Sequence, residues 1–400
     1  MSTNRLWLAL VLLFGLLSAT GCGVSLNGDD DDSADDDVIT PPDDDDDDAG
    51  DDDDSAGDDD DSTPGDDDDA AVVIDSFYPA AGSTGVYVRT VLWVDFSGPT
   101  TAEGTLARVD NGAQVELTAK MVSETRWVFI PSVPLEYSTL YTASVTWDDG
   151  QDSMEFTTSD VGSVPVEQNL VGRAYAWDVG SGALVMPAGA GAVLDKLNQT
   201  LLTGVVAQSD DFLGLLAARP VAGSDPPAQD LCTETADLTG PDPAGDDDDS
   251  AGDDDDSAGD DDDSAGSDAR EAGGGWSDPY FSAGPADITV SIEVPIFGEI
   301  PLTFYEAEFS GTFVSSTPGG AADSIAGGAF KTFLDLRDTG IPCEQAAAFL
   351  AVSCEPCPNE AKSLECVNLW IVDLVADLVP DLSLVPRSSD AIDADPGCSG

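Results

Sequence analysis

The chain has 400 residues, which is enough for two domains once low-complexity segments are set aside. Lys and Arg number 13 against 80 Asp and Glu, so the net charge is 13 − 80 = −67. This charge excludes nucleic acid as a partner, because Lys and Arg must replace the phosphate counterions. The absence of His excludes Ser-His-Asp and Cys-His catalysis and His-ligated zinc.

The first 21 residues have the pattern of an export signal. Arg5 precedes an apolar stretch at 6–17, and small residues lead up to Cys22. A charged start, a short apolar segment and small residues before a cleavage site are typical of a secretory signal peptide. The apolar stretch is also shorter than the roughly 20 residues of a transmembrane helix. We therefore predict a signal peptide over residues 1–21.

Ala19, Thr20, Gly21 and Cys22 resemble the lipobox of bacterial lipoproteins, with Ala19 where the family commonly has Leu. The resemblance implies that Cys22 becomes the first residue of the mature chain and carries a lipid that holds it to the membrane. Gly23, in place of Asp, implies sorting to the outer membrane of a Gram-negative cell. A surface-exposed position follows from this hypothesis. The alternative is an ordinary secreted protein in which Cys22 is incidental.

Two segments, 22–70 and 240–272, consist largely of Asp, Ser, Ala, Gly and Pro. The heptad DDDDSAG occurs three times in 246–266 and again at 51–57. Such segments cannot form a core, and like charges repel, so we predict disorder. The first segment is predicted to be an acidic stem, and the second an insertion in a surface loop. Contiguous Asp residues lack the spaced ligands of a calcium loop, so only weak cation association is expected.

Residues 71–160 show the alternation of short β-strands. Asp-Asp-Gly at 148–150 is a hairpin signal, and Leu92, Val94 and Phe96 are expected to share one face. About seven such strands without a helical period predict an antiparallel β-sandwich. The clearest strands are 91–96, 125–131, 139–147 and 153–158.

The same residues resemble the SbsA-type bacterial Ig-like domain over about 90 positions. The resemblance implies a spacer or adhesion module of bacterial surface proteins, and it brings no catalytic motif. It rests on Phe77-Tyr78-Pro79, Gly82, Gly85-Val86, Val91 to Ser97, Pro99, Trp127-Val128-Phe129, Pro131, Leu135, Tyr141 and Phe156-Thr157-Thr158.

Residues 165–400 are predicted to form a larger, mainly β domain. Apolar and β-branched runs favour strands through most of it, with short helices expected at 191–202 and 343–354. The dense apolar run at 367–379 is interpreted as a buried strand or helix, and the alternative is a membrane-lying amphipathic segment, against which Asp373 and Asp377 argue. The segment also resembles cysteine-containing lipoproteins of predatory or social bacteria, a likeness that implies no activity. The predicted strands are 169–179, 201–208, 212–219, 276–281, 288–294, 303–314 and 329–337.

Six cysteines remain after Cys22, and an even number in an exported chain predicts disulfides. Fifteen pairings are open. Cys354-x-x-Cys357 leaves a redox pair as an alternative, and four of the cysteines leave a zinc site as another. We expect disulfides and no metal. The candidates are Cys232, Cys343, Cys354, Cys357, Cys366 and Cys398.

Glycoside hydrolases use a pair of carboxylates and need no His for catalysis. Glu306, Glu308 and Asp335 lie on predicted strands, and Asp335 near Arg337 is interpreted as an ion-pair partner or a loop anchor. We therefore expect a non-enzymatic envelope lipoprotein, without a cofactor, that presents its β modules for binding, adhesion or envelope architecture. Its ligand is an unknown protein or glycan. The alternatives are an envelope hydrolase acting on carbohydrate or peptide, and a lipid or small-ligand carrier with a cavity lined by Phe304 and Phe313.

Overall fold

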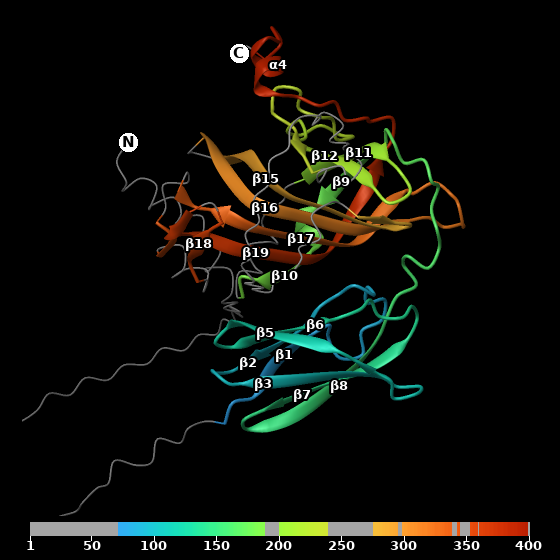
Figure 1. Ribbon diagram of the computed structural model, residues 1–400, viewed down its shortest axis with the longest axis vertical. Helices are drawn as coiled ribbons and strands as arrows, with labels where there is room; N and C mark the ends of the chain where they lie inside the picture. Colours follow the sequence, from blue (N-terminus) through green and yellow to red (C-terminus); the bar gives the residue numbers. More distant parts are fainter. Residues whose placement is uncertain are drawn as a thin grey trace, which may run out of the picture. The chain divides into compact units, whose positions relative to one another are not determined.

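A computed structural model of the 400-residue chain describes residues 71–188, 200–238, 275–294, 298–337, 342–344, 353–358 and 360–398. The predicted signal peptide at 1–21, Cys22, the stem at 22–70 and the insertion at 240–272 lie outside the described residues. The described residues belong to one compact unit, residues 71–294 and 298–400, which contains two β folds (Figure 1).

The first fold is the predicted antiparallel sandwich, with two sheets of four strands. One sheet has the order β1-β2-β6-β5, and the other has the order β4-β3-β7-β8. The predicted hairpin at 148–150 is confirmed, because Trp147 and Gly150 pair at the turn between β7 and β8. The strands are β1 (Ile74–Tyr78), β2 (Leu92–Phe96), β3 (Ala102–Arg108), β4 (Gln114–Val115), β5 (Leu117–Ser123), β6 (Arg126–Pro131), β7 (Leu140–Trp147) and β8 (Gly150–Thr157).

Strand β2 shows why the sandwich forms. Leu92, Val94 and Phe96 belong to the core between the two sheets, as predicted, and each is at most 3% exposed. Trp93 lies on the opposite face of the strand and is also buried, at 6% exposure. Side chains alternate between the two faces of a strand, so β2 is covered on both sides.

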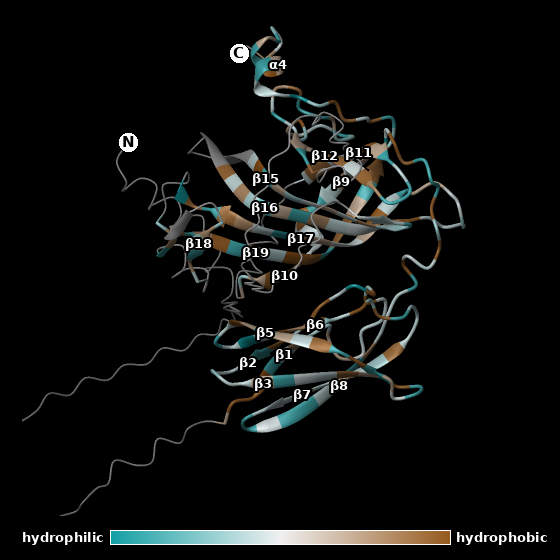
Figure 2. Cartoon of the chain, in the orientation of Figure 1, coloured by the Kyte–Doolittle hydropathy of each residue, from teal (hydrophilic) through white to brown (hydrophobic). Residues whose placement is uncertain are grey.

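The second fold is one sheet of eleven antiparallel strands. Its main path runs β13-β12-β11-β9-β19-β17-β16-β15-β14, and β10 and β18 pair with β19. Figure 2 shows brown and teal residues mixed along its strands. The strands are β9 (Ala174–Asp178), β10 (Ala183–Met186), β11 (Thr200–Gln208), β12 (Leu213–Ala218), β13 (Ala236–Asp237), β14 (Trp276–Ser277), β15 (Tyr280–Val294), β16 (Gly298–Val314), β17 (Ser324–Asp335), β18 (Glu355–Cys357) and β19 (Glu360–Val379).

This sheet curls until its two edges meet. Phe212, before β12, forms an antiparallel bridge with Gly275, before β14. The Leu238 backbone nitrogen donates to the Leu215 oxygen, and the Gly284 nitrogen donates to the Leu238 oxygen at 3.0 Å. Leu238 and Gly275 flank the 240–272 segment, so that segment connects the two edges of one sheet.

Aromatic side chains fill the inside of the curled sheet. The Phe313 ring is fully buried and lies 5.1–5.7 Å, centre to centre, from the rings of three aromatic residues. Trp177 is equally buried, and its Nε1 donates to the Thr203 hydroxyl at 2.8 Å. Phe313 is therefore a packed core residue and does not border an open cavity. Its ring neighbours are Tyr175, Trp276 and Phe281.

The structure describes only parts of the two helices that the sequence predicts, at 191–202 and 343–354. The expected helix at 191–202 is wrong at its end, because residues 200–202 belong to β11, which pairs on both sides with β9 and β12. Residues 191–199 lie outside the described part. Cys343 and Glu344 are helical, while 345–352 lie outside it. The run 367–379 is a strand, part of β19.

Two features complete the fold. A short helix, α4 (Ser389–Asp393), follows the last strand, and its N-cap Ser388 accepts from the Ala391 nitrogen at 3.3 Å. Among the helices that the structure describes, none is long and apolar enough to cross a membrane.

Candidate functional site

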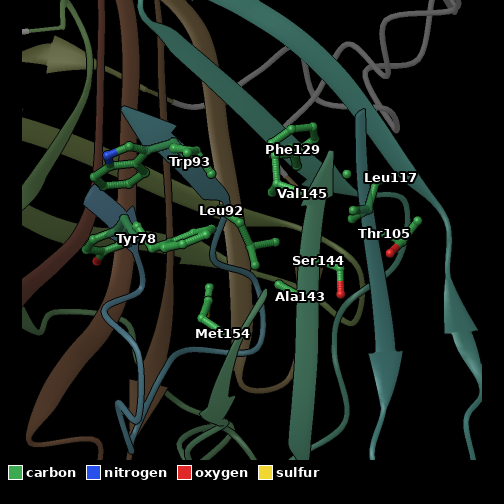
Figure 3. A pocket seen from close by; sticks show the side chains of 13 residues that line it. Tyr78, Leu92, Trp93, Thr105, Leu117, Phe129, Ala143, Ser144, Val145 and Met154 are labelled. Atoms are coloured by element: carbon green, nitrogen blue, oxygen red, sulfur yellow. The ribbon is translucent and has the colours of Figure 1, made fainter. Parts of the chain in front are cut away.

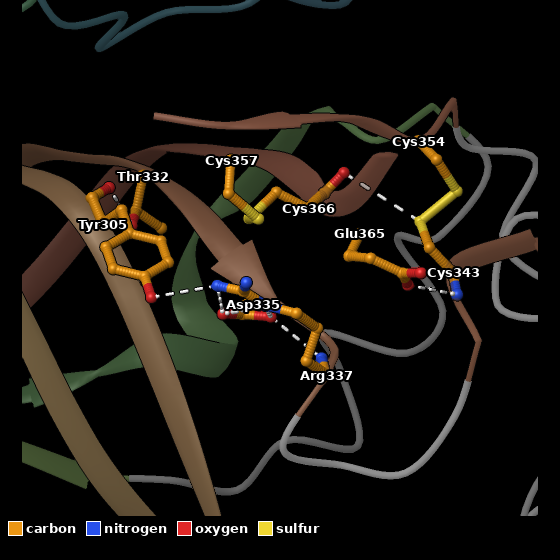
Figure 4. The surroundings of a disulfide bond; sticks show 9 residues. All are labelled: Tyr305, Thr332, Asp335, Arg337, Cys343, Cys354, Cys357, Glu365 and Cys366. Atoms are coloured by element: carbon orange, nitrogen blue, oxygen red, sulfur yellow. Dashed lines mark hydrogen bonds and ion pairs between the residues drawn. A yellow bond between two sulfur atoms is a disulfide. The ribbon is translucent and has the colours of Figure 1, made fainter. Parts of the chain in front are cut away.

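The six cysteines expected to form disulfides do so in the structure. Cys232 pairs with Cys398 across 166 positions, which ties the segment after β12 to the end of the described chain. The other two bridges close short loops of 11 and 9 positions beside β18 and β19. Cys354 and Cys357 belong to different bridges, so the Cys-x-x-Cys segment is not a redox pair in this structure. The short bridges are Cys343–Cys354 and Cys357–Cys366 (Figure 4).

A buried carboxylate lies next to the Cys357–Cys366 bridge. Asp335, 2% exposed, accepts from the Arg337 side chain at 2.6 Å and from the Arg337 backbone nitrogen at 2.8 Å (Figure 4). Burial alone raises the pKa of this carboxyl, but the hydrogen bonds and charge of Arg337 outweigh it and hold the pKa below its usual range. Asp335 is therefore the ionised half of a structural ion pair, as the sequence predicted.

Glu308, another of the expected acids, is not brought to Asp335. Asp335 pairs with Thr303 across β16 and β17, and Glu308 lies five residues further along β16, about 16 Å away. Two glycosidase carboxyls lie within about 10 Å of each other. The Asp335 carboxylate does lie near the sulfurs of Cys357 and Cys366, within 4.8 Å. Those sulfurs form a disulfide and offer no thiolate to a metal.

The core of the sandwich contains only a small void. It has a volume of about 10 Å³ and is lined by apolar side chains such as Leu92, Phe129 and Met154 (Figure 3). That volume is about the smallest that holds one water molecule. The void is consequently a packing defect between the two sheets rather than a ligand site.

The outer face of the β1-β2-β6-β5 sheet packs against the curled sheet. Its apolar residues and those of β10 and β19 form one buried cluster. Burial of this kind stabilises an interface by about 25 cal/mol per Å² of apolar surface. The cluster, called the junction below, consists of Val91, Trp93, Val128, Val185, Met186, Trp370 and Val372.

Two polar contacts border the junction. The Tyr78 ring stacks on the Trp93 ring, with centres 3.7 Å apart, and the Tyr78 hydroxyl donates to the Asp373 carboxylate. Asp373 has a φ of 59°, a left-handed conformation that turns it out of the regular strand. Burial raises the pKa of Asp373 to about 7. A carboxyl with this pKa is partly protonated at neutral pH.

Arg126 makes the second contact. Its Nε and Nη2 bind the two Asp95 oxygens at 2.6 and 2.8 Å, and its Nη1 donates to the carbonyl oxygens of Leu184 and Val185. Bidentate pairs of this geometry are among the strong hydrogen bonds of proteins. Arg126 thus joins β2 and β6 of the sandwich to β10 of the curled sheet.

A cavity of about 280 Å³ opens beside the junction. It lies between the 88–91 and 130–134 segments of the sandwich and strands β15, β16, β17 and β19. Its charged lining residues are Arg89, Glu308 and Lys331. Charged, hydroxyl and aromatic groups come together in this cavity.

Sequence reasoning missed the junction and this cavity. A signal was present, because Val91, Leu92, Trp93 and Val94 form a continuous apolar run, whereas a strand with one wet face alternates. The run indicates burial on both faces, but it does not identify the second surface.

Comparison with known proteins supports the first fold. The family described as the bacterial Ig-like domain matches residues 68–159. No curated protein sequence matches the chain.

Solved structures resemble parts of the chain. PcoC, a methionine-rich copper resistance protein from Escherichia coli, is 18% identical, with 22% of this chain and 100% of that chain covered and a TM-score of 0.20. CopC from Methylosinus trichosporium OB3b is 17% identical, with 22% and 93% covered and a TM-score of 0.19.

The N-terminal part of the bacterial S-layer protein SbsC is 13% identical, with 38% of this chain and 41% of that chain covered and a TM-score of 0.21. At these scores the structural likenesses carry no functional argument. The family match is the informative comparison, because a bacterial Ig-like domain fits a cell-envelope or cell-surface protein.

Proposed function

We propose that this chain is a non-enzymatic lipoprotein of the cell envelope, anchored through Cys22, that presents an Ig-like sandwich and a curled sheet for binding. The observation that carries the proposal is the order of its parts. A lipobox-like leader ends at Cys22, an acidic segment follows to residue 70, and the bacterial Ig-like domain begins there. A lipid at Cys22 would hold the chain to the outer membrane, and the acidic stem would keep the folded part in solvent.

The disulfides support an exported chain. Disulfides persist in oxidising compartments and are rare in the cytosol. Cys232–Cys398 and the two short bridges involve every cysteine after Cys22. This leaves Cys22 as the single cysteine available for lipid attachment.

The binding role is favoured over the hydrolase and the carrier. Asp335 is engaged by Arg337 and lies far from Glu308, so these two acids do not converge as a catalytic pair. Phe313, expected to line a carrier cavity, is packed among aromatic rings. The cavity beside the junction is lined by charged and hydroxyl groups as well as by aromatic and aliphatic ones.

Membrane fractionation tests the anchor. The wild-type chain is expected in the membrane fraction. Protease added to intact cells is expected to digest it, because the chain is proposed to face the outside. Cys22→Ser removes the thiol that accepts the lipid, so this variant is expected in the soluble fraction. A Cys22→Ser variant that stays in the membrane would refute the lipid anchor, and protection of the wild type from protease would refute surface exposure.

A further inference from the structure

We propose that the cavity beside the junction binds a carboxylated sugar, such as a uronic acid unit. The inference rests on the proposed binding function and names its ligand class. The cavity volume of about 280 Å³ is near the lower end of the range for small-ligand sites. A single sugar ring with its substituents is of this order of size.

The curled sheet provides one wall of the cavity, built by strand register. Alternate residues of four neighbouring strands face the same side of the sheet. Ser282, Ser310 and Ala329 pair across β15, β16 and β17 in one row. The next row pairs Glu308, Lys331 and Trp370 across β16, β17 and β19. Hydroxyl, charged and aromatic groups therefore lie side by side on one surface.

Two cations mark the cavity as a site for an anion. The Arg89 guanidinium lies 3.6 Å from the centre of the Tyr280 ring, and Lys331 Nζ lies 4.6 Å from the Trp370 ring. In the part of the chain that the structure describes, neither cation forms an ion pair. The chain has 13 basic residues against 80 acids, so two cations outside any described ion pair at one cavity are unusual, although the lining also includes Glu308, opposite Lys331 across β16 and β17. A ligand carboxylate would give both a partner.

The remaining groups favour a sugar over an acyl chain. The Trp370 ring lines the cavity, and its buried Nε1 has no hydrogen-bond partner. Buried donors in proteins are nearly always paired, so an unpaired indole N–H beside a cavity calls for an acceptor. Ser282 and Ser310 add hydroxyls, which suit sugar hydroxyl groups. Aliphatic side chains such as Val88, Ile130 and Val133 also line the cavity, but a lipid chain would leave its charged and hydroxyl groups without partners.

Isothermal titration calorimetry on the purified full chain tests the proposal. The two ligands are galacturonate and galactose, which have the same ring, and only galacturonate has a carboxylate. Galacturonate is expected to bind at least tenfold more tightly than galactose. Lys331→Gln and Arg89→Gln are each expected to weaken galacturonate binding about tenfold, because each removes a charge-assisted contact. Lys331→Arg is expected to retain most of the binding. Lys120→Gln, an exposed cation on β5, is the matched control and is expected to have no effect.

Equal affinity for the two sugars, or no binding of galacturonate, would overturn the proposal on the wild-type chain alone, whatever the variants do. Wild-type affinity in both cavity variants, with melting temperatures unchanged, would also overturn it. Calorimetry does not depend on Cys22. A chain that binds galacturonate but is not anchored refutes only the lipoprotein function, and an anchored chain that does not bind refutes only the ligand.

Discussion

The Tyr78 hydroxyl donates a hydrogen bond to the Asp373 carboxylate, and the two residues are 295 positions apart in the sequence. The bond connects β1 of the Ig-like sandwich to β19 of the curled sheet. It lies beside the junction, because Tyr78 also stacks on Trp93. A titratable group thus lies at a contact between the two folds.

Asp373→Asn is expected to change the pH dependence of unfolding. Burial raises the Asp373 pKa in the folded protein from 3.8 to about 7. The folded state therefore holds this proton more tightly, and the associated stability is present below about pH 4 and lost as the pH rises to 7. The full shift corresponds to about 4 kcal/mol. Asn keeps an acceptor for Tyr78 and carries no charge.

Urea denaturation at pH 5 and pH 8 measures this difference. Asp373→Asn should gain free energy of unfolding over the wild type at pH 8, and gain less at pH 5. Asp377→Asn, at an exposed position of the same strand, is the control and should show no such change. An Asp373→Asn effect of the same size at both pH values would show that Asp373 titrates normally.

Arg126→Gln is expected to destabilise the protein by about 3 kcal/mol. The substitution leaves Asp95 without its bidentate partner and leaves two β10 carbonyl oxygens without a donor. Arg108→Gln is the matched control, since its partners Asp110 and Glu136 are about 60% exposed. Exposed pairs of this kind are screened by solvent and contribute much less than buried ones. Thermal melting compares the two variants, and equal losses would show that Arg126 is no stronger a link than a surface pair.

The three disulfides should differ in what they contribute. Cys232–Cys398 encloses 166 positions and Cys357–Cys366 encloses 9. The chain-entropy relation gives about 5 kcal/mol for the long loop and about 3 kcal/mol for the short one. Replacing both cysteines of each bridge by Ser and measuring unfolding by denaturant tests this order. A larger loss from the short bridge would mean that local packing, and not loop length, sets the contribution.

Gly284→Ala tests the close approach of β15 to β16. Gly284 has a φ of 97°, and an added Cβ would lie 2.3 Å from the Ala307 carbonyl oxygen. The clash with backbone cannot be relieved by a rotamer change, so a loss of about 3 kcal/mol is expected.

Gly223→Ala is the control for Gly284→Ala, because Gly223 has a φ of 72° with no atom within 4 Å. It isolates the cost of the backbone conformation, about 1 kcal/mol. Similar melting temperatures for the two variants would contradict the close approach at Gly284.

The sandwich could be predicted from local patterns. Leu92, Val94 and Phe96 alternate, and Asp148-Asp149-Gly150 signals a turn, so the sequence contains both the strand and its end. The secondary structure of Thr200 to Leu202 is harder to predict, because these residues fit both a helical periodicity and an apolar β-strand. Pairing with β9 and β12 decides in favour of the strand, and such pairing is a tertiary effect.

The junction and its cavity could not be predicted because they depend on distant segments. Trp93 and Trp370 are 277 positions apart, since 370 − 93 = 277, and share one buried cluster. Nothing in either local sequence indicates its partner. The disulfide pairing was likewise open at fifteen combinations, and the register of β17, β18 and β19 decides it for Cys366 and Cys357.

The lipid anchor at Cys22 is best tested by the intact mass of the mature protein isolated from its native cells. We expect a chain that begins at Cys22, lacks residues 1–21 and carries the added mass of acyl chains at that cysteine. A chain that retains Met1, or one that begins at or near Cys22 without acyl groups, would contradict it.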